Sequence, residues 1–573
     1  MKGPCSAAIP FNPLKATIHT MSPTRSIVAT LALLVAGLAL QAQTVTPDDL
    51  KLDALGKKVD AVLSMAVQAD RKILVGGVFE SGDKQEALLR RLNEDGSLDT
   101  GFMPSLDAAN PEAPMAIQTL AVQRDGKILA GGLFDGVAGV PRTSLARLNP
   151  DGSLDLNFRP AIGNSGFFGP QVICLLVQED GRILVAGGFT SLGGRSQPSL
   201  GRLHVDGSLD TSFRPDIAGG FSFGQSISTL LLQPDGKILL GGFFFYEVNG
   251  QPREFIGRLR SDGTLDIGFD PRPDGPVNTL AIQSDGKLLV AGNFREIAGQ
   301  VRPGLARLKP DGSIDEAFVP SDRLFDSNGI WAFAIQSDGR ILLGLVPLSD
   351  NAASPGIVRL NQDGSMDEGF RTSMAGDQSR GVWTLALQRN GRILVGGSFT
   401  SLGGVPRDGL GRLINTGTSI DTVSRNGSTL TWQRGGTAPE VMRADFQYSL
   451  DGTSWLDIGE GTRVPGGWQR TGAAIPEGAR TRVRGSVAGS LHGSNWFIET
   501  PLGTGGEKPV VKLSVTNATI TLSWSDQPGT IHVQRSTSLI PPIVWQTIQT
   551  VEAGGSISLP LQTEEAYFRI HQP

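Results

Sequence analysis

Residues 123–129 read Gln-Arg-Asp-Gly-Lys-Ile-Leu, and residues 147–158 read Arg-Leu-Asn-Pro-Asp-Gly-Ser-Leu-Asp-Leu-Asn-Phe. The first block occurs seven times at intervals of 50 to 55 residues, and the second block follows each copy, shortened in the last. The first block opens with glutamine at 68, 123, 178, 233, 283, 336 and 388, and the second with arginine at 91, 147, 202, 258, 307, 359 and 412. Such a period indicates a repeat architecture, in which each unit buries its apolar face against its neighbours.

Each copy predicts about four short antiparallel strands. Apolar runs at 277–283 and 287–294 flank an Asp-Gly pair at 285–286, and a second pair of runs flanks Asp-Gly at 311–312. Asp-Gly favours a tight hairpin in which both central residues take positive φ. Seven such units without helical periodicity predict an all-β fold, a seven-bladed β-propeller over residues 43–415. A right-handed β-helix is the alternative, although its coils are shorter and lack paired hairpin turns.

A glycine pair follows the second apolar run in most copies, as at Gly131-Gly132, and removes Cβ atoms where backbones must approach closely. The whole consensus, Gln-x-Asp-Gly-Lys-Ile-Leu-x-Gly-Gly-x-Phe followed by Arg-Leu-Asn-x-Asp-Gly-Ser-Leu-Asp-x-x-Phe, resembles the delta-60 repeat of secreted bacterial proteins. The resemblance covers about residues 60 to 415 and implies a propeller without an assigned activity. Copy six has Gly344-Leu-Val-Pro347 instead of Gly-Gly-x-Phe, so we expect a bent or looser blade.

The seventh copy ends after Asn415 and lacks the Leu-Asp-x-x-Phe strand, whereas Leu50-Lys-Leu-Asp-Ala-Leu55 precedes the first copy. We expect the N-terminal piece to complete the last blade, because pairing the chain ends removes exposed strand edges. Trimming residues 43–58 is then expected to lower the melting temperature of the whole ring, and an unchanged melt would contradict this.

Two further all-β modules are expected after the ring. Six of the eight tryptophans lie beyond residue 416, where short alternating strands begin. Residues 416–502 resemble a fibronectin type III or immunoglobulin-like β-sandwich, and residues 508–573 a shorter β-sandwich. Together with the ring, the predicted fold is a seven-bladed β-propeller followed by two β-sandwich modules.

Residues 1–42 have the pattern of a signal peptide. They contain basic but no acidic residues, and an apolar run from Ile27 to Leu40 that is shorter than a membrane-spanning helix requires. A membrane anchor is the weaker reading, so we expect a secreted chain at the cell surface, outside the cell or in the periplasm. Cys174, in an apolar run, is expected to be a buried hydrophobe rather than a nucleophile.

The recurrent charged residues, such as Arg147, Asp151 and Asp155, are expected to do one structural job in each blade, because a ligand site is expected where the copies differ. Phe167, Phe168, Phe221 and Phe223 lie in the least regular connections and form the candidate binding rim; packing of these loops against the ring is the alternative.

The expected function is non-catalytic binding or adhesion through an extracellular protein or glycan. A net charge of −5 gives no basic surplus for nucleic acid, and the histidines show no metal-ligand spacing. We therefore expect no catalytic residue, no cofactor and no metal, with calcium in the Asp-Gly turns as an alternative. Two other functions stay open. One is a polysaccharide-active hydrolase or lyase with unrepeated carboxylates at the ring axis, and the other is a spacer that presents the C-terminal modules.

Overall fold

A computed structural model describes the chain in two compact units, residues 42–502 and the segments 1–41 with 503–573. The described residues are 59–501, with gaps at 82–83, 108–114, 164–168, 220–226, 244, 322–323, 325–326, 348–355, 371, 377–380, 416, 477 and 489–494. Outside that span the backbone is described for 15–17, 20–21, 26–32, 512–516, 519–524, 531–536, 546–551, 555–560 and 567–571. In none of these stretches is a helix long and apolar enough to cross a membrane.

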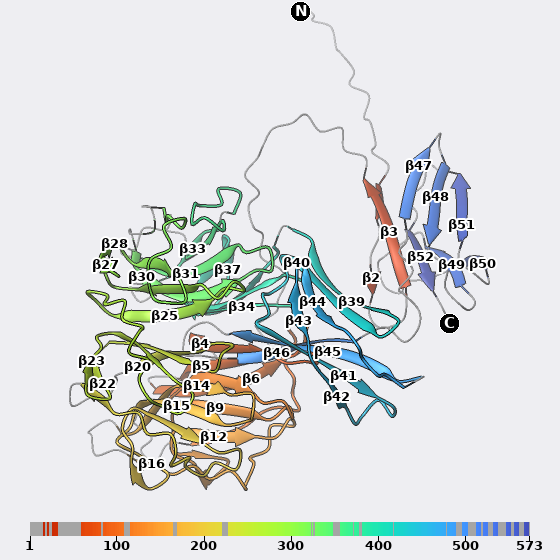
Figure 1. Ribbon diagram of the computed structural model, residues 1–573. Helices are drawn as coiled ribbons and strands as arrows, with labels where there is room; N and C mark the ends of the chain where they lie inside the picture. The colour runs from red at the N-terminus through yellow and green to blue at the C-terminus, as the bar shows by residue number, and fades with distance from the viewer. Residues whose placement is uncertain are drawn as a thin grey trace, which may run out of the picture. The chain divides into compact units, whose positions relative to one another are not determined.

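Each of the seven sequence copies forms a three-stranded antiparallel sheet, which is one blade (Figure 1). The innermost strands are β4 (Val59–Val67), β8 (Ala116–Val122), β14 (Gln171–Val177), β20 (Ile227–Leu232), β25 (Val277–Ile282), β30 (Ser327–Ile335) and β34 (Gly381–Leu387). The middle strands are β5 (Ile73–Ser81), β9 (Ile128–Leu133), β15 (Ile183–Gly188), β21 (Ile238–Gly242), β26 (Leu288–Gly292), β31 (Ile341–Pro347) and β35 (Ile393–Ser398). The outer strands are β6 (Lys84–Leu92), β12 (Leu145–Leu148), β18 (Leu200–Leu203), β24 (Ile256–Leu259), β29 (Leu305–Leu308), β32 (Ile357–Leu360) and β38 (Leu410–Leu413).

The innermost strands pack side by side in sequence order, and the circle closes where β34 and β35 lie against β4. The seven-bladed propeller is therefore confirmed, and the β-helix alternative is wrong. Buried leucine, isoleucine and valine side chains of adjacent blades form the core between them. Residues 43–58, which were expected to complete the last blade, lie outside the described residues.

The expectation of about four strands in each blade needs correction. Where a fourth strand was expected, six blades have one isolated bridge, such as Leu148 with Leu154. The chain then turns, with Phe158 N–H donating to Asp155 O. A small hairpin instead follows the middle strand in five blades. The hairpin strands are β10 (Gly136–Val137), β11 (Val140–Pro141), β16 (Ser191–Leu192), β17 (Arg195–Ser196), β22 (Phe245–Val248), β23 (Gln251–Pro252), β27 (Glu296–Ile297), β28 (Gln300–Val301), β36 (Ser401–Leu402) and β37 (Val405–Pro406). In four of these blades a short strand that precedes the innermost strand pairs with the hairpin, and these strands are β7 (Leu106–Asp107), β13 (Ile162–Gly163), β19 (Ile217–Gly219) and β33 (Met374–Ala375).

The Asp-Gly turns form hairpins as expected, but the expected conformation is wrong. Only the glycine takes positive φ, for example Gly126 at 84°. The aspartate instead uses its side chain, and Asp125 Oδ1 accepts a hydrogen bond from Lys127 N–H at 3.1 Å. The turn is thus fixed by an aspartate acceptor and one left-handed residue, and in blade one Arg71 takes that conformation, with φ of 70°.

The glycine pairs occur where backbones approach closely, as expected. A Cβ on Gly131 would lie 2.6 Å from Val172 of the next blade, and one on Gly132 would lie 2.0 Å from the Ala116 carbonyl of its own blade. Blade six keeps its first glycine, Gly344, 2.7 Å by the same measure from Val382. Its second glycine is replaced by Leu345, which is buried. The sixth blade therefore keeps its contact with the seventh despite its sequence.

Residues 419–501 form two antiparallel sheets beside the ring, and we call them the sealing module. One sheet has the order β39-β40-β44-β43. The other has the order β46-β45-β41-β42 and continues into blade two, where β46 pairs in parallel with β8 through Asn495 and Ala121. Their strands are β39 (Ser419–Asn426), β40 (Thr429–Gly436), β41 (Arg443–Ser449), β42 (Leu456–Glu460), β43 (Thr462–Val464), β44 (Gly467–Arg470), β45 (Arg480–Ala488) and β46 (Asn495–Pro501). Trp432 of one sheet packs against Gly485 of the other, where a Cβ would lie 2.5 Å from the indole.

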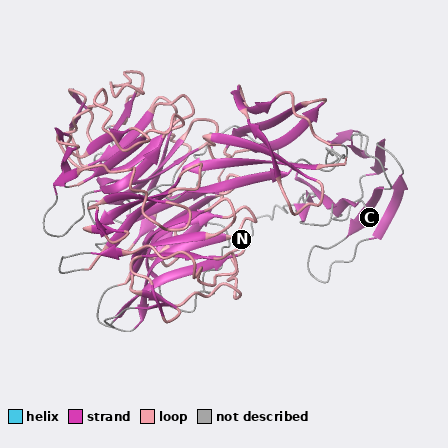
Figure 2. Cartoon of the chain, turned by 60° about the horizontal axis from the view of Figure 1, so that its bottom comes forward, coloured by secondary structure: helices cyan, strands magenta, loops and turns pink. Residues whose placement is uncertain are grey.

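The second unit also consists of strands (Figure 2). One sheet has the order β47-β48-β51, and the other β1-β3-β52-β49-β50 with β2 beside β3. The strands are β47 (Lys512–Thr516), β48 (Thr519–Trp524), β49 (Ile531–Ser536), β50 (Gln546–Val551), β51 (Gly555–Pro560), β52 (Tyr567–His571), β1 (Lys15–Thr17), β2 (Thr20–Met21) and β3 (Ser26–Ala32). The proposal that residues 1–42 are a cleaved signal peptide is not tested by this pairing and stays a prediction.

Candidate functional site: the inner strands of the propeller

The repeated arginine, aspartate and phenylalanine form one compact knot in each of six blades. In blade three, Arg202 Nε donates to Asp210 Oδ2 at 2.7 Å, and the guanidinium lies over the Phe213 ring, 4.5 Å from its centroid. The same triplet recurs as Arg91, Asp99 and Phe102; Arg147, Asp155 and Phe158; Arg258, Asp266 and Phe269; Arg307, Asp315 and Phe318; and Arg359, Asp367 and Phe370. The structural role expected for these residues is confirmed.

The knot also joins each blade to the next. Arg202 Nη1 donates to the carbonyl of Ser261, just before the second Asp-Gly turn of the following blade, at 2.6 Å. Arg412 of blade seven makes this bond to the Glu94 carbonyl of blade one, also at 2.6 Å, and so closes the ring. Blade seven has no second Asp-Gly turn, and there Asn415 Oδ1 accepts from Arg359 Nη1 at 2.7 Å.

The aspartates of the second Asp-Gly turn are engaged in the turn itself. Asp151 Oδ1 accepts from Ser153 N–H at 2.9 Å and from Ser153 Oγ at 2.7 Å. These bonds lower the pKa of Asp151. Among the described residues no group of three or more histidine, cysteine, aspartate or glutamate side chains is arranged to hold a metal ion. Calcium in these turns remains an untested alternative.

One position on the innermost strand lies at a β-bulge, and its residue type varies between blades, unlike the residues of the knots. Each innermost strand has a β-bulge one to four residues after it joins its partner, for instance between Val382 and Thr384. The seven bulge residues, which we call the girdle, are Leu63, Gln118, Ile173, Ser228, Asn278, Trp331 and Trp383. A bulge re-aims a side chain and is common beside functional sites. None of the seven side chains is ionisable.

Two girdle side chains reach the next blade. Ser228 Oγ donates to the Val277 carbonyl at 3.1 Å, and Asn278 Nδ2 contacts the Ile330 carbonyl at 3.3 Å. Each acceptor directly precedes the girdle residue of its own blade. The bulges are thereby linked from blade four to blade six.

Three half-buried aromatic rings meet over this part of the girdle, and we call them the aromatic arc. Trp331 and Trp383 pack edge to face with centroids 5.3 Å apart, and Phe243 stacks on Trp331 at 6.0 Å. Phe243 belongs to blade four and Trp331 to blade six, which are not neighbours in the ring. Their contact therefore crosses blade five at the channel mouth, and the arc lies on this face.

Next to the arc, polar side chains pack closely around Gly329, and we call this corner the Gly329 notch. The point where a Cβ would stand on this glycine lies 2.6 Å from Asn293 Oδ1, 3.1 Å from Asn278 Nδ2 and 3.6 Å from Trp331 Nε1. Asn293 is exposed and Gly329 is half-buried. Asn278 is completely buried, and its Oδ1 and the Trp331 indole N–H have no hydrogen-bond partner. Asn278 Nδ2 already donates to Asn293 Oδ1 at 3.4 Å and to the Ile330 carbonyl at 3.3 Å. The atoms of this corner that lack a partner, where buried polar groups are normally paired, are therefore Asn278 Oδ1 and Trp331 Nε1.

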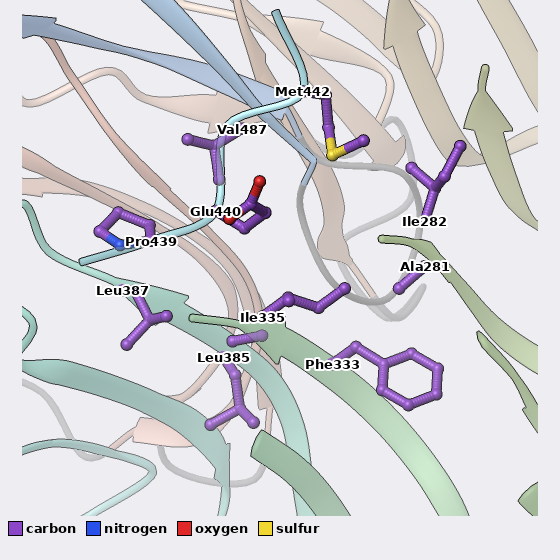
Figure 3. A pocket seen from close by; sticks show the side chains of 11 residues that line it. Ala281, Ile282, Phe333, Ile335, Leu385, Leu387, Pro439, Glu440, Met442 and Val487 are labelled. Carbon is purple, nitrogen blue, oxygen red and sulfur yellow. The ribbon is translucent and has the colours of Figure 1, made fainter. Parts of the chain in front are cut away.

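The opposite mouth of the channel is covered by the sealing module. The module contacts the ends of the innermost strands. These ends lie four residues beyond the girdle, which is about 13 Å along an extended strand. Glu440 N–H donates to the Ile335 carbonyl, and Ser337 N–H donates to the Ala438 carbonyl. Figure 3 shows Pro439, Glu440 and Met442 facing the apolar strand ends. The space left there is about 30 Å³, room for about two water molecules.

The variable residue of the Gln-x-Asp-Gly turn accounts for much of this attachment. In blades two, six and seven, Arg124 pairs with Asp445 at 2.6 Å, Ser337 Oγ donates to Pro439 O at 3.0 Å, and Arg389 pairs with Asp421. In blade three Glu179 pairs with Arg443. Sequence reasoning missed this role, because only the fold shows that these turns face one partner.

Asp421 is the centre of a buried polar cluster at this seal. Its carboxylate accepts from Trp432 Nε1 at 2.7 Å and Thr500 Oγ1 at 2.8 Å, and Arg434 lies at 3.1 Å. Burial works to raise the pKa of Asp421, but the charges of Arg434 and Arg389 outweigh it and the pKa is lowered. Burial raises the pKa of Glu440 beside it. These ionisable groups are used to attach the module.

Two sequence predictions about single residues have different outcomes. Cys174 is fully buried and burial raises its pKa, so its reading as a small hydrophobe is confirmed. Phe167, Phe168, Phe221 and Phe223 lie outside the described residues, and the binding rim that they were expected to form stays a prediction.

A protein-family model matches the recurring segments. Its description is "Domain of unknown function (DUF5122) beta-propeller", and it matches residues 68–102, 123–158, 178–213, 233–269, 283–318, 336–370 and 388–419. The chain carries seven DUF5122 repeats. Six of the matched DUF5122 segments run from the turn glutamine to the phenylalanine of the knot. All seven girdle residues lie outside the DUF5122 segments, which separates them from what the repeats share.

Solved structures similar to the chain include two crystal structures of Sqt1 from Chaetomium thermophilum. One has 15% identity over 63% of this chain and 96% of that chain, with a TM-score of 0.24. The other has 12% identity over 77% and 97%, with a TM-score of 0.20. The phage phi92 endosialidase has 9% identity over 85% of this chain and 71% of that chain, with a TM-score of 0.16. No curated protein matches the chain.

Proposed function

We propose that the chain is a secreted, non-catalytic binding protein whose ligand meets the ring at the mouth that carries the girdle. The observation that supports this proposal is that shared and variable residues of the repeat have different roles. Shared residues are used in the knots and glycine contacts, whereas the girdle residues are all uncharged and outside the shared segments. A site with partly exposed aromatic rings and a few polar groups is typical of ligand recognition.

The geometry favours binding over hydrolysis or elimination. A glycoside hydrolase needs two carboxyl groups about 5 to 10 Å apart, and the girdle contains neither aspartate nor glutamate. Asp421 and Glu440 are buried carboxyl groups that belong to the opposite mouth and attach the module. A turnover assay against neutral and acidic polysaccharides tests this choice, and release of reducing ends by the purified protein would contradict it.

We assign the C-terminal modules a presenting and sealing role. Two facing sheets around Trp432 support a fibronectin type III-like β-sandwich for residues 416–502, and the strands of 508–573 support a shorter sandwich. Because the first module occupies one mouth, ligands approach the ring from the other. A partner outside the cell, either a protein or a glycan, agrees with the export pattern of residues 1–42.

A binding screen with the full chain tests the proposal. The probes are immobilised glycans and extracellular proteins, and each is applied to the unaltered chain, Trp383→Ala and Tyr246→Ala. Tyr246 is an exposed ring on the small hairpin of blade four and is the matched control. We expect at least one probe to be captured by the unaltered chain and Tyr246→Ala but not by Trp383→Ala. Capture that needs only the C-terminal modules would favour the spacer function instead.

A further inference from the structure

We infer that blade two binds an oxyanion, the carboxylate, sulfate or phosphate group of a ligand, between Arg142 and Arg159. Neither arginine belongs to the girdle, so this site goes beyond the proposed function and does not depend on it. The inference comes from a comparison of equivalent positions in blades two, three, four and five.

An arginine directly follows the small hairpin in four of the five blades that have one, and we call it the hairpin arginine. Blade four shows its setting. Arg253 is 7% exposed, and its guanidinium donates to the Pro252 carbonyl at 2.6 Å and to the Ile267 carbonyl at 2.9 Å. Because a charge that is removed from water needs a partner of opposite sign, such a guanidinium calls for a nearby anion. The hairpin arginines are Arg142, Arg253, Arg302 and Arg407, and blade three has Gln197 at this position.

Blades four and five supply this anion from their own chain. In blade four Asp270 directly follows the phenylalanine of the knot, and its Oδ2 lies 3.6 Å from Arg253 Nη1. The Asp270 side chain is 22% exposed, so an oxygen from the solvent side can reach this guanidinium. In blade five Glu316 Oε2 lies 3.4 Å from Arg302 Nη2.

Blade two has the buried hairpin arginine without the carboxylate. Arg142 is 8% exposed. Exposed Arg159 stands where blade four has its aspartate, and Leu156 stands where blade five has its glutamate. Among the residues that the structure describes, no aspartate or glutamate forms an ion pair with either arginine. Burial and the positive charge of Arg159 lower the pKa of Arg142, so its charged form is disfavoured by its surroundings.

The knot of this blade does not replace the missing carboxylate. Asp155 Oδ2 accepts from Arg147 Nε and from Lys127 Nζ, each at 2.9 Å, and Asp155 Oδ1 accepts from Asn157 N–H at 3.0 Å. The negative charge of Asp155 acts against the lowering of the Arg142 pKa but does not outweigh it. Both oxygens of Asp155 are therefore in use, and Arg142 keeps an uncompensated charge.

The two guanidinium groups of blade two meet at one point. Arg159 Nε donates to the Leu156 carbonyl at 2.8 Å, and Arg142 Nη2 contacts the same oxygen at 3.5 Å. A planar guanidinium matches the oxygens of a carboxylate, sulfate or phosphate, and hydrogen bonds of this kind are stronger than those between neutral groups. A cation would be repelled by the pair, and a neutral group would leave both charges uncompensated. The site therefore selects an oxyanion.

Blade three provides the matched control within the same chain. Arg214 stands at the position of Arg159, but the hairpin residue is Gln197, whose Nε2 donates to the Leu200 carbonyl at 2.8 Å. This blade thus has the exposed arginine and no buried guanidinium. Arg159→Asp gives blade two the aspartate of blade four, and Arg214→Asp makes the same change of charge in blade three.

The test is titration calorimetry of the full chain with sodium sulfate, sodium phosphate and sodium acetate, at an ionic strength held constant with sodium chloride. We expect saturable binding of at least one of these anions at one site in each chain, and the tightest of the three identifies the preferred group. Arg159→Asp should weaken this binding tenfold or more, whereas Arg214→Asp and Trp383→Ala should bind like the unaltered chain. Without added anion, Arg159→Asp should melt at a higher temperature than the unaltered chain, because its new carboxylate pairs with Arg142.

Three outcomes would overturn the oxyanion site. They are the absence of saturable binding for all three anions, equal affinity in Arg159→Asp and the unaltered chain, and an equal loss of affinity in Arg214→Asp. Arg142→Gln, which gives blade two the hairpin residue of blade three, should also lose the anion, and it decides the question if Arg159→Asp does not fold. Because Trp383→Ala alone reports on the girdle, failure of the oxyanion site and failure of the proposed function are distinguishable.

Discussion

The knots at the outer strands and the girdle at the inner strands use the same repeat in opposite ways. Each knot keeps the same three residue types in six blades, and the arginine in each joins the next blade. The girdle occupies one equivalent position in seven blades and holds six different residue types. A position that stabilises the junction between blades is expected to be uniform, because each blade contacts only its neighbours and the stability of the ring depends on each of these junctions.

The difference shows where selection for a ligand can act without cost to the fold. A bulge side chain leaves the strand ladder, so its identity has little effect on the pairing of the strand. The knots have no such freedom, since each arginine satisfies an aspartate, a ring face and a backbone carbonyl at once. Four variants separate the two regions by stability and by binding.

The largest loss of stability is expected for Arg202→Ala. The Arg202 side chain is 3% exposed and its partner Asp210 is 4% exposed. Removing the arginine leaves a buried carboxylate with Arg182 and Ser212 as its remaining partners, which costs about 3 kcal/mol. Urea unfolding measures this change, with exposed Arg195→Ala as the matched control. A loss below about 1 kcal/mol would show that the knot is not the junction between blades.

A smaller loss is expected for Arg412→Ala, which removes the junction that closes the ring. Arg412 donates to the Glu94 carbonyl, but it has Ile420 where the other copies have their aspartate. Because this bond is made to a backbone carbonyl, the expected loss is about 1.5 to 3 kcal/mol, the contribution of a charge-assisted hydrogen bond. Hydrogen exchange should report faster opening of β4 and β34 before the other inner strands. Uniform exchange throughout the ring would contradict this order.

The knots should also set the response to acid. The hydrogen bond from the Lys72 ammonium, reinforced by Arg91, lowers the pKa of Asp99 to about 2. A depressed folded pKa contributes stability that is complete above about pH 4, the ordinary pKa of aspartate, and is lost as the pH falls toward 2. The melting temperature of the unaltered chain should fall across this window. Asp99→Asn should melt lower at pH 7 and show a shallower fall, and parallel curves would contradict the assignment.

The smallest loss of stability and the largest loss of binding are expected for Trp383→Ala. The ring is half-buried on the channel mouth, so its removal should cost about 1 kcal/mol of apolar burial. Ligand capture should disappear at the same time. The control is ligand binding by Arg202→Ala, measured below the melting temperature of that variant. Arg202→Ala should keep its affinity for the ligand. A variant at Trp383 that unfolds like Arg202→Ala would place the girdle among the structural positions.

The repeat period and the turn residues were sufficient to predict the all-β ring and its seven blades. They were also sufficient to predict a structural role for Arg147, Asp151 and Asp155, because a residue that recurs in the units is expected to have the same structural role in each of them. The number of strands in a blade was not predictable in this way. The knot of Asp155 and Phe158 turns the chain after a single bridge, so a fourth strand does not form. Contacts with the next blade, such as that of Arg147 with the Val205 carbonyl, favour the knot over a longer strand.

The candidate site shows the same limit. Trp331 and Trp383 were visible in the sequence, but nothing in their spacing said that they meet each other and Phe243 at the channel mouth. The notch at Gly329 combines residues from two blades, and the role of Arg124 and Arg389 depends on a module that begins after the ring. What the sequence determined by itself was the unit, its turns and the number of copies, because these follow from local periodicity and backbone preference. Only the tertiary structure decided which mouth the sealing module covers and which side chains meet at the other, because closing a ring brings together positions that are hundreds of residues apart along the chain.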